Sequence, residues 1–315
     1  MEKKLGLATR DAYGQALVEI GRSNPKVVVL DGDLSVSTKT NLFAKEFPDR
    51  FFNVGIAEAN LVGLASGLAQ AGKIPFISSF ACFMVCKGYD QLRMAVAVPH
   101  QNVKVVTSHG GISVGEDGAS QQSIEDVALM VSMPGFIVAV PSDEHCTRAL
   151  VKQAADVKGP VYIRTGRPKA PLVHEAATSF TFGKGILLRK GKDVTLVANG
   201  LMVFESLWAA EQLEKEGLSV SVIDMHTVKP LDEDLLIAQA EATGAVVTAE
   251  EHQVWGGLGS AVASALGRKY PVPQELVGIQ DTYAESGKPD ELMEKYGLTG
   301  RRIAEAARRA VQRKR

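Results

Sequence analysis

The strongest constraint on the fold is a regular alternation between short β-branched runs and longer amphipathic stretches. Four runs are typical of buried strands, at residues 27–30, 103–108, 136–140 and 161–164. Helical patterns lie before and between them, at residues 9–20, 57–71, 123–131 and 143–157. Because parallel strands need crossover connections that are usually helices, the alternation predicts a mostly parallel sheet with helices on both faces.

The alternation stops after Arg164 and resumes later in the chain. Residues 165–180 carry two prolines and little periodicity, which is typical of a linker. Further strand patterns follow at residues 193–200, 219–224 and 245–250, with helical patterns between them. A chain of 315 residues can bury two cores. We therefore predict two doubly wound α/β domains, residues 1–180 and 181–315.

Composition excludes several classes of protein. The net charge of −1 gives no sign of a nucleic-acid or acidic-lipid partner. The first residues, MEKKLGLATR, have no apolar signal core, and no run approaches the roughly 20 apolar residues of a membrane span. Cys82, Cys86 and Cys146 are too few for a disulfide framework, and one close pair does not make a zinc site. We expect a reduced cytoplasmic protein without a metal site of its own.

Glu58 is the first candidate for chemistry. It lies in FFNVGIAEANLVGLASGLAQAG, where an extended run leads into a helix rich in glycine, alanine and serine. Small residues on several faces allow such a helix to pack closely against another surface. An acid in the first turn is also stabilised by the helix dipole, and spacing alone favours that ordinary interpretation.

The segment SHGGISVGEDGASQQSIED, residues 108–126, links a buried strand to a helix. Polar, glycine-rich loops at the carboxyl end of a parallel strand are where α/β sheets bind ligands. We favour a binding loop over a flexible surface loop, because His109 directly follows the strand.

Two further motifs allow more than one interpretation. Phe80 and Phe83 could be ordinary core residues or the walls of a slot for a flat heterocycle, since aromatic rings stack with offset geometry. WGGLGSAV, residues 255–262, suggests a dinucleotide loop, but Val262 stands where the third glycine belongs. A tight strand-to-helix turn explains this second motif adequately.

Three polar side chains could bind one anion. LATR places Arg10 at the start of the first helix, DGDLSVS places Ser37 in a loop after a strand, and IRTGRP places Arg164 at a strand end. Guanidinium groups and a hydroxyl suit the geometry of a phosphate. Each could equally be ordinary surface, and the sequence alone does not prove that they converge.

Taken together, these segments resemble the transketolases. LATR, VVVLDGDLSVST, NVGIAEANLVGLASGLA, SHGGISVGEDGASQQSIED and IRTGRP occur in the order and spacing of that family. The resemblance covers nearly the whole chain, but it is to the second half of a transketolase only. It implies a pyrimidine-binding domain followed by a C-terminal domain that holds no catalytic residue.

The resemblance implies a role for each candidate around thiamine diphosphate. Glu58 matches the glutamate that hydrogen-bonds N1′ of the aminopyrimidine and favours its imino tautomer. Phe80 and Phe83 match the aromatic pocket around that ring. Gln121 stands where many members have histidine and others glutamine, so fine specificity stays open.

The resemblance also implies how a sugar phosphate is bound. His109 matches a histidine that contacts the donor sugar near the bond that breaks, and Asp117 matches the residue that reads a donor hydroxyl. The phosphate-binding residues of the family match Arg10, Ser37 and Arg164. Pentose phosphates are the default substrates of the family, although split transketolases can serve other sugar pathways.

One missing motif predicts a partner. The family holds the diphosphate through magnesium or another divalent metal, with Gly-Asp-Gly followed by paired asparagines. This chain has Gly32-Asp33-Leu34 and no Asn-Asn. The resemblance therefore implies that an N-terminal subunit supplies the metal and the diphosphate site, in a heterotetramer of two plus two chains.

Three other functions compete with this interpretation. The β subunit of a 2-oxo-acid dehydrogenase has a similar size and a glutamate like Glu58, but it needs no sugar-phosphate site. A synthase that joins pyruvate to a triose phosphate normally keeps both halves in one chain. A catalytically inactive regulatory paralogue would have no reason to keep Glu58 and His109.

Overall fold

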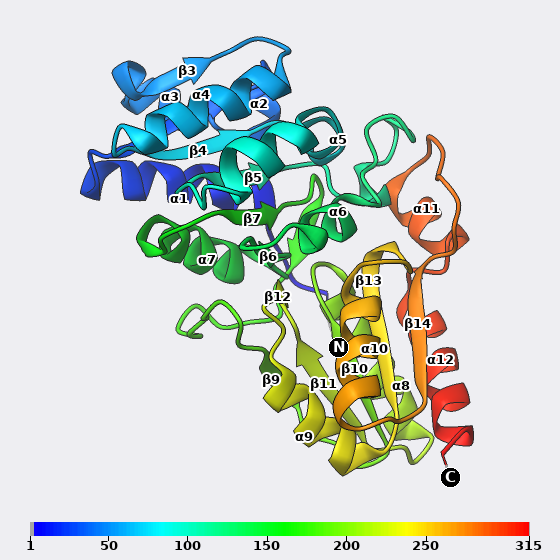
Figure 1. The fold of residues 1–315 in the computed structure, drawn as a ribbon. Helices are drawn as coiled ribbons and strands as arrows, with labels where there is room; N and C mark the ends of the chain where they lie inside the picture. The colour runs from blue at the N-terminus through cyan, green and yellow to red at the C-terminus, as the bar shows by residue number, and fades with distance from the viewer. Residues whose placement is uncertain (1–2, 315) are drawn as a thin grey trace.

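Two parallel sheets dominate the structure, a computed structural model that describes residues 3–314. Figure 1 shows the first sheet in the upper half of the molecule and the second in the lower half. The first has seven strands in the order β12-β6-β7-β5-β4-β2-β3, and β12 alone is antiparallel to its neighbour. Their bounds are β2 (Val27–Asp31), β3 (Phe51–Asn53), β4 (Ile74–Ser78), β5 (Lys104–Thr107), β6 (Ile137–Ala139), β7 (Val161–Arg164) and β12 (Thr227–Lys229).

Helices cover both faces of the first sheet because its central strands are buried on both sides. One face packs against α1 (Thr9–Ser23), α3 (Asn41–Glu46) and α7 (Glu144–Asp156). The other packs against α4 (Glu58–Gln70), α5 (Ala81–Gln91) and α6 (Asp126–Ser132), and α5 continues into a π-helical turn, Leu92–Ala97. The short helix α2 (Ser35–Thr38) follows β2.

The second sheet has five strands in the order β14-β13-β10-β11-β9, all parallel except β9. Its strands are β9 (Ile186–Arg189), β10 (Val194–Ala198), β11 (Val220–Asp224), β13 (Val246–Gln253) and β14 (Gln274–Ile279). Its two faces are covered by α8 (Met202–Lys215) with α12 (Gly300–Gln312), and by α9 (Glu233–Thr243) with α10 (Leu258–Lys269). The predicted two-part, mostly parallel α/β fold is confirmed.

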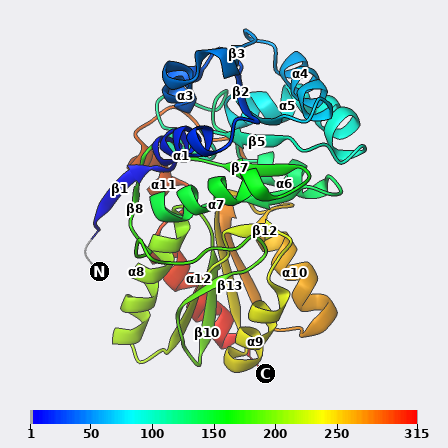
Figure 2. The same ribbon diagram turned by 90° about the vertical axis from the view of Figure 1, so that its left-hand side faces the viewer.

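Three details differ from the sequence expectation. The segment 165–180 is not only a linker, because it contains β8 (Lys169–Pro171), which pairs antiparallel with β1 (Leu5–Ala8) (Figure 2). The helix expected from residue 123 begins at Asp126, since Ser123 forms a β-bridge with Gly110. β12 comes from the second half of the chain yet completes the first sheet, so the division near residue 180 stays a prediction.

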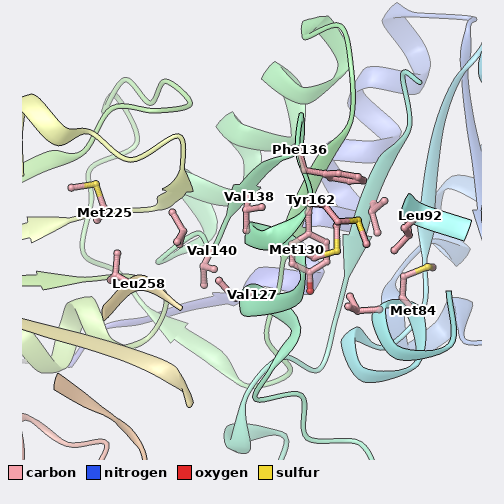
Figure 3. Close-up of a cluster of buried hydrophobic side chains, with 14 of the residues drawn as sticks. Met84, Leu92, Val127, Met130, Phe136, Val138, Val140, Tyr162, Met225 and Leu258 are labelled. Carbon is pink, nitrogen blue, oxygen red and sulfur yellow. The ribbon is translucent and has the colours of Figure 1, made fainter. Parts of the chain in front are cut away.

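The two halves share part of their hydrophobic core. A single buried cluster runs from Met84 and Leu92 in the first half, through Val127 and Val140, to Leu258 in the second (Figure 3). Because protein interiors are close-packed, a shared core of this kind holds the two sheets in one arrangement. Side chains of the second half can therefore act on loops of the first. Within residues 3–314, no helix is long and apolar enough to cross a membrane.

Candidate functional site

Glu58 is buried at the first position of α4, at the carboxyl edge of the first sheet. Its side chain is 2% exposed, and Oε1 accepts a hydrogen bond from Ser79 Oγ at 3.2 Å. Lys87 Nζ, which is exposed on α5, lies 3.7 Å from Oε2. A buried carboxylate is costly unless it is paired or hydrogen-bonded. Glu58 has one such partner on each oxygen, and the second is a weak, solvent-accessible ion pair.

Three rings stack beside Glu58. The Phe80 ring stacks with Phe83, with centroids 5.5 Å and planes 19° apart, and with His109, with centroids 3.6 Å and planes 20° apart. Phe80 is buried, whereas Phe83 is half-buried and carries the Lys87 ammonium 4.6 Å from its centroid. Because Lys87 lies close to both the Phe83 ring and the Glu58 carboxylate, these two groups are neighbours. A flat heterocycle that stacks on the half-buried Phe83 ring could therefore reach Glu58.

His109 lies two residues after the end of β5, close to the strand end at which the sequence placed it. Its backbone is left-handed, with φ of 60°, and its Nδ1 lies 2.9 Å from Ser108 Oγ. Burial lowers the pKa of the imidazole to about 3, and the nearby Arg10 and Arg167 add to this effect. The ring is therefore neutral at physiological pH and can both donate and accept a hydrogen bond.

The low pKa gives a direct test of this environment. We expect the His109 ring to show no titration between pH 5 and 8 in ¹³C-histidine NMR spectra of the chain, whereas an unperturbed histidine titrates near 6.5. Assignment through a His109→Gln variant identifies the resonance. A midpoint above pH 5 would show that the ring is more solvated than the structure has it.

The loop after His109 is anchored rather than free. Residues 110–115 are buried, and Gln122 Nε2 donates to the carbonyls of Gly115 and Glu285 at 3.1 Å. Helix α11 (Pro289–Lys295) packs against the turn at residues 112–114 (Figure 1). Glu116 and Asp117 are exposed at the tip. The second half of the chain therefore holds the base of this loop and leaves the tip to solvent.

Arg10 lies close to Ser37, with which the phosphate hypothesis groups it, and to Asp117. Arg10 Nη1 donates to the Ser37 carbonyl at 3.1 Å. Burial lowers the pKa of the Arg10 guanidinium, and Asp117 and Arg167 are close enough to influence it. Arg10 Nε is buried without a hydrogen-bond partner. An unpaired buried donor is costly, so an anion at this position would be stabilised.

The hydrogen bonds and the ion pair of Arg164, the third residue of the phosphate hypothesis, join it to other protein groups, and its contact with an anion stays a prediction. Its side chain is 4% exposed, and Nε lies 3.3 Å from Asp126 Oδ2. Nη2 donates to the carbonyls of Ser123 at 2.9 Å and Glu251 at 2.8 Å. Arg164 therefore points into the protein, between the first and second sheets, where its charge is already neutralised.

Arg167, the second arginine of this segment, lies close enough to influence both Arg10 and His109. It is half-buried, it donates to the Val114 carbonyl and to Glu116 at 3.0 Å, and its charge acts on both Arg10 and His109. IRTGRP contains both arginines, and sequence reasoning singled out Arg164 alone for the phosphate. The two arginines differ in burial: Arg164 lies at the buried strand end beside the acidic Asp126, whereas Arg167 is half-buried.

Gln121 lies next to the ring stack. Its backbone carbonyl is 3.4 Å from Cys82 Sγ on α5, one residue before Phe83, and its side chain accepts from Ser120. The side chain is half-buried and has no contact with Glu58 in the described structure. Gln121 could therefore contact a ligand that stacks on Phe83.

The residues present fit the pyrimidine part of thiamine diphosphate. A buried carboxylate with one loosely paired oxygen beside an accessible aromatic ring suits an aminopyrimidine, which both stacks and hydrogen-bonds. The metal part finds no such match, since no group of three or more His, Cys, Asp or Glu side chains within residues 3–314 is placed to hold an ion.

The WGGLGSAV segment forms a tight turn, and the first backbone N–H groups of the helix that follows already donate to a glutamate side chain. Glu250 accepts hydrogen bonds from the backbone N–H groups of Leu258 and Gly259, each at 2.8 Å. A Cβ added at Gly257 would lie 2.2 Å from the same carboxylate. Because these N–H groups are the anion site of a dinucleotide loop, Glu250 fills the position of a diphosphate.

Comparison with protein families matches two domain models to successive parts of the chain. Residues 6–172 match the transketolase pyrimidine-binding domain, and residues 183–303 match the transketolase C-terminal domain. Together these matches cover most of the chain.

Individual relatives agree with the family models. The chain is 45% identical to a protein described as a putative transketolase C-terminal section from Methanocaldococcus jannaschii, over 94% of this chain and 93% of that one. It is 44% identical to a 6-deoxy-6-sulfo-D-fructose transketolase subunit from Clostridium sp., over 97% and 95%. Human transketolase is 40% identical over 96% of this chain, which spans 49% of the human protein.

Solved structures agree as well. A split-gene transketolase, described as an inactive β4 tetramer, superposes with a TM-score of 0.93 and 52% identity, covering 98% of this chain and all of that one. The transketolase of Campylobacter jejuni gives a TM-score of 0.80 at 26% identity, and the match covers 95% of this chain and 46% of that one. The chain is therefore similar in extent to separate subunits and to half of the longer enzymes.

Proposed function

Because the chain belongs to the transketolase family, we propose that it is the pyrimidine-binding half of a two-subunit transketolase. In this proposal it transfers a two-carbon ketol unit from a ketose phosphate to an aldose phosphate, and only with a partner subunit. The observation that carries the proposal is the buried Glu58 carboxylate beside the Phe80, Phe83 and His109 ring stack. Such an arrangement suits a heterocycle that must both stack and exchange a proton.

The cofactor residues follow from this geometry. When bound, thiamine diphosphate supplies a carbon nucleophile that later accepts the electron pair of the breaking C–C bond. Glu58 holds a proton at N1′ of the aminopyrimidine, and Ser79 orients the carboxylate through its hydrogen bond at 3.2 Å. Phe83 stacks against the ring, while Gln121 lies at its edge. Phe80 sets the position of His109 by stacking on it.

The proposed substrate residues begin at His109, which stacks on Phe80. His109, neutral and just beyond the end of β5, contacts the hydroxyl and carbonyl groups of the donor sugar. Asp117, at the exposed tip of the loop, recognises a hydroxyl group of the donor sugar. Arg10, Arg167 and Ser37 bind the terminal phosphate, which satisfies the unpaired Nε of Arg10. This assignment replaces Arg164 with Arg167.

The partner supplies what this chain does not. The sequence of this chain has neither Gly-Asp-Gly nor Asn-Asn, and the longer relatives are about twice as long as this chain. The similar split-gene transketolase is inactive as a β4 tetramer. These observations support an N-terminal subunit that brings magnesium and the diphosphate site, in a heterotetramer. Ketol transfer by the reconstituted complex, measured with a screen of donor sugars, tests the proposal.

The acidic loop and the arginine pair favour transketolase over the β subunit of a 2-oxo-acid dehydrogenase. A dehydrogenase acts on small 2-oxo acids and needs no second anion site some distance from the reacting carbon. Arg10 and Arg167, placed about the tip that bears Asp117, provide such a site. We disfavour an inactive regulatory subunit, because one oxygen of the Glu58 carboxylate is only loosely paired and could bind a ligand.

We expect Arg167→Ala to raise KM for phosphorylated acceptors about tenfold to a hundredfold, since a hydrogen bond to a charged group contributes roughly 1.5–3 kcal/mol. KM for the matching unphosphorylated aldehydes should stay within about twofold. Steady-state kinetics of the reconstituted complex measure both. The control is Arg22→Ala, which removes an exposed arginine paired with Glu46 at the opposite end of α1. Equal losses for both kinds of acceptor would show that Arg167 is not a phosphate ligand.

A further inference from the structure

Glu251, at the carboxyl end of β13 in the second half of the chain, lies directly beneath the loop that carries His109. The side chain is 7% exposed, and Oε1 accepts a hydrogen bond from the backbone N–H of Ser113 at 2.6 Å. The loop is therefore tied to the C-terminal domain by a carboxylate. The family resemblance assigns no catalytic residue to that domain.

The loop has glycine where it approaches this carboxylate. A Cβ added at Gly111 would lie 2.2 Å from Glu251 Cδ, and the backbone there is left-handed, with φ of 85°. A Cβ at Gly110 would lie 2.0 Å from Arg164 Nε. Because both positions are glycine, the loop backbone can lie directly against the Arg164 and Glu251 side chains.

Arg164 links this contact to the first half of the chain. Its Nη2 donates to the carbonyls of Glu251 and Ser123, and its Nε is paired with Asp126. Burial raises the pKa of the Glu251 carboxyl, while the Arg164 charge opposes that shift. Both side chains are buried, and the backbone from Gly110 to Ser113 lies against them.

A glycine-rich loop is expensive to order, because glycine loses more backbone freedom on folding than any other residue. The backbone of Gly110 and Gly111 donates two hydrogen bonds to the first half, from Gly110 N to Thr165 at 3.2 Å and from Gly111 N to Ser123 at 2.7 Å. The Ser113 bond to a buried carboxylate is shorter and charge-assisted, and such bonds are about twice as strong as neutral ones.

We propose that Glu251 is a positioning residue for the active site, which sets the His109 loop from the C-terminal domain through its hydrogen bond to Ser113 N. The effect on His109 passes through the backbone of Gly110 to Ser113. The C-terminal domain thereby contributes to the geometry of the site without touching the substrate. The catalytic consequence rests on the proposed function, whereas the ordering of the loop does not.

Amide hydrogen exchange on the isolated chain tests the ordering directly. Glu251→Met removes the acceptor but fills the same space, and Glu251→Gln keeps an oxygen that can accept from Ser113. We expect exchange over residues 109–115 to rise about tenfold to a hundredfold in Glu251→Met, the loss predicted for one charge-assisted bond. In Glu251→Gln it should stay within about threefold of the original chain.

The matched control is Glu205→Met. Glu205, in the first turn of α8, is also a carboxylate of the second half that accepts from a backbone N–H, but its donor is Gly300 N, at the start of α12, at 2.6 Å. This control should change exchange around residue 300 and leave residues 109–115 unaffected. Unchanged exchange in Glu251→Met, or equal loosening in Glu205→Met, would overturn the proposal.

The reconstituted complex then tests the catalytic consequence. Glu251→Met should lower kcat/KM for the donor ketose about tenfold or more, Glu251→Gln should restore it to within about threefold, and Glu205→Met should leave it unchanged. A loosened loop with unchanged kinetics would mean that His109 needs no fixed position, which contradicts the positioning role. Absence of ketol transfer in the original complex would instead refute the proposed function and leave the exchange result valid.

Discussion

Replacement of Glu58 by glutamine is expected to lower ketol transfer by the complex about a hundredfold to ten-thousandfold, the range attributed to a positioned acid–base group. Glutamine has nearly the same shape, and its amide oxygen can still accept the hydrogen bond from Ser79. It cannot hold or share a proton with N1′ of the aminopyrimidine. Folding and assembly should therefore stay intact while the proton transfer is lost.

The most direct measurement is hydrogen–deuterium exchange at C2 of the thiamine thiazolium, followed by NMR after quenching the complex. The rate reports the proton transfer that Glu58 supports, independently of the sugar. An unchanged rate in Glu58→Gln would refute the assigned role. Loss of assembly would contradict it in another way, because it would show that the ion pair with Lys87 is structural.

A second acidic residue at a helix start serves as a control, which distinguishes proton transfer by Glu58 from simple stabilisation of a helix dipole. Glu144 is in the first turn of α7 and accepts from the backbone N–H of Leu7. If Glu58 only complemented a helix dipole, both substitutions would change stability by a fraction of a kcal/mol and activity hardly at all. We expect Glu144→Gln to behave in this way and Glu58→Gln to differ from it in activity alone.

The periodic parts of the chain were predictable because burial on both faces leaves a local signature. Strands β2, β5, β7 and β10 are fully buried, and their β-branched runs have the expected bounds to within a residue or two. Glu58 and His109 could be located in the same way, since each sits at the junction of a strand or turn with the next element. Local pattern is sufficient wherever the decisive neighbours are close in sequence.

The remaining features depend on neighbours distant in sequence. Arg164 and Arg167 have similar local settings, but Arg164 turns inward because Asp126 and the Glu251 carbonyl lie there. The pairing of β1 with β8 brings together segments about 160 residues apart, and neither is strongly periodic. The contact of Glu251 with the His109 loop is equally invisible in sequence, because a buried acid in a strand has no pattern of its own.

Reconstitution with a partner is expected to give the largest change of all, from background activity to full ketol transfer. The chain has two sheets with helices on both faces and a shared core, so it should fold and self-associate alone. The proposed cofactor site is only half present, and a ligand held by its pyrimidine end alone should bind weakly. We therefore expect no detectable transfer from the isolated chain, even with thiamine diphosphate and magnesium.

The surface near Glu58 is suited to a partner. Ile56 is 76% exposed and Leu64 is 46% exposed, and a Cβ at Gly63 or Gly67 on α4 would meet nothing within 4 Å. Exposed apolar side chains beside small residues allow a second helix to approach closely. We propose that this face of α4 becomes interface in the assembled enzyme.

The decisive experiment is a titration of the purified chain with a subunit that carries Gly-Asp-Gly and Asn-Asn. Cofactor binding, followed by calorimetry, and ketol transfer should rise together and saturate near equal amounts, because each site needs one copy of each chain. Leu64→Glu should weaken assembly and shift the titration to higher partner concentrations, since it places a charge on the proposed interface. Tyr270→Glu, at an exposed site after α10, should not shift it. Full activity from the isolated chain would contradict the two-subunit assignment, because it would require a diphosphate site that the sequence does not contain.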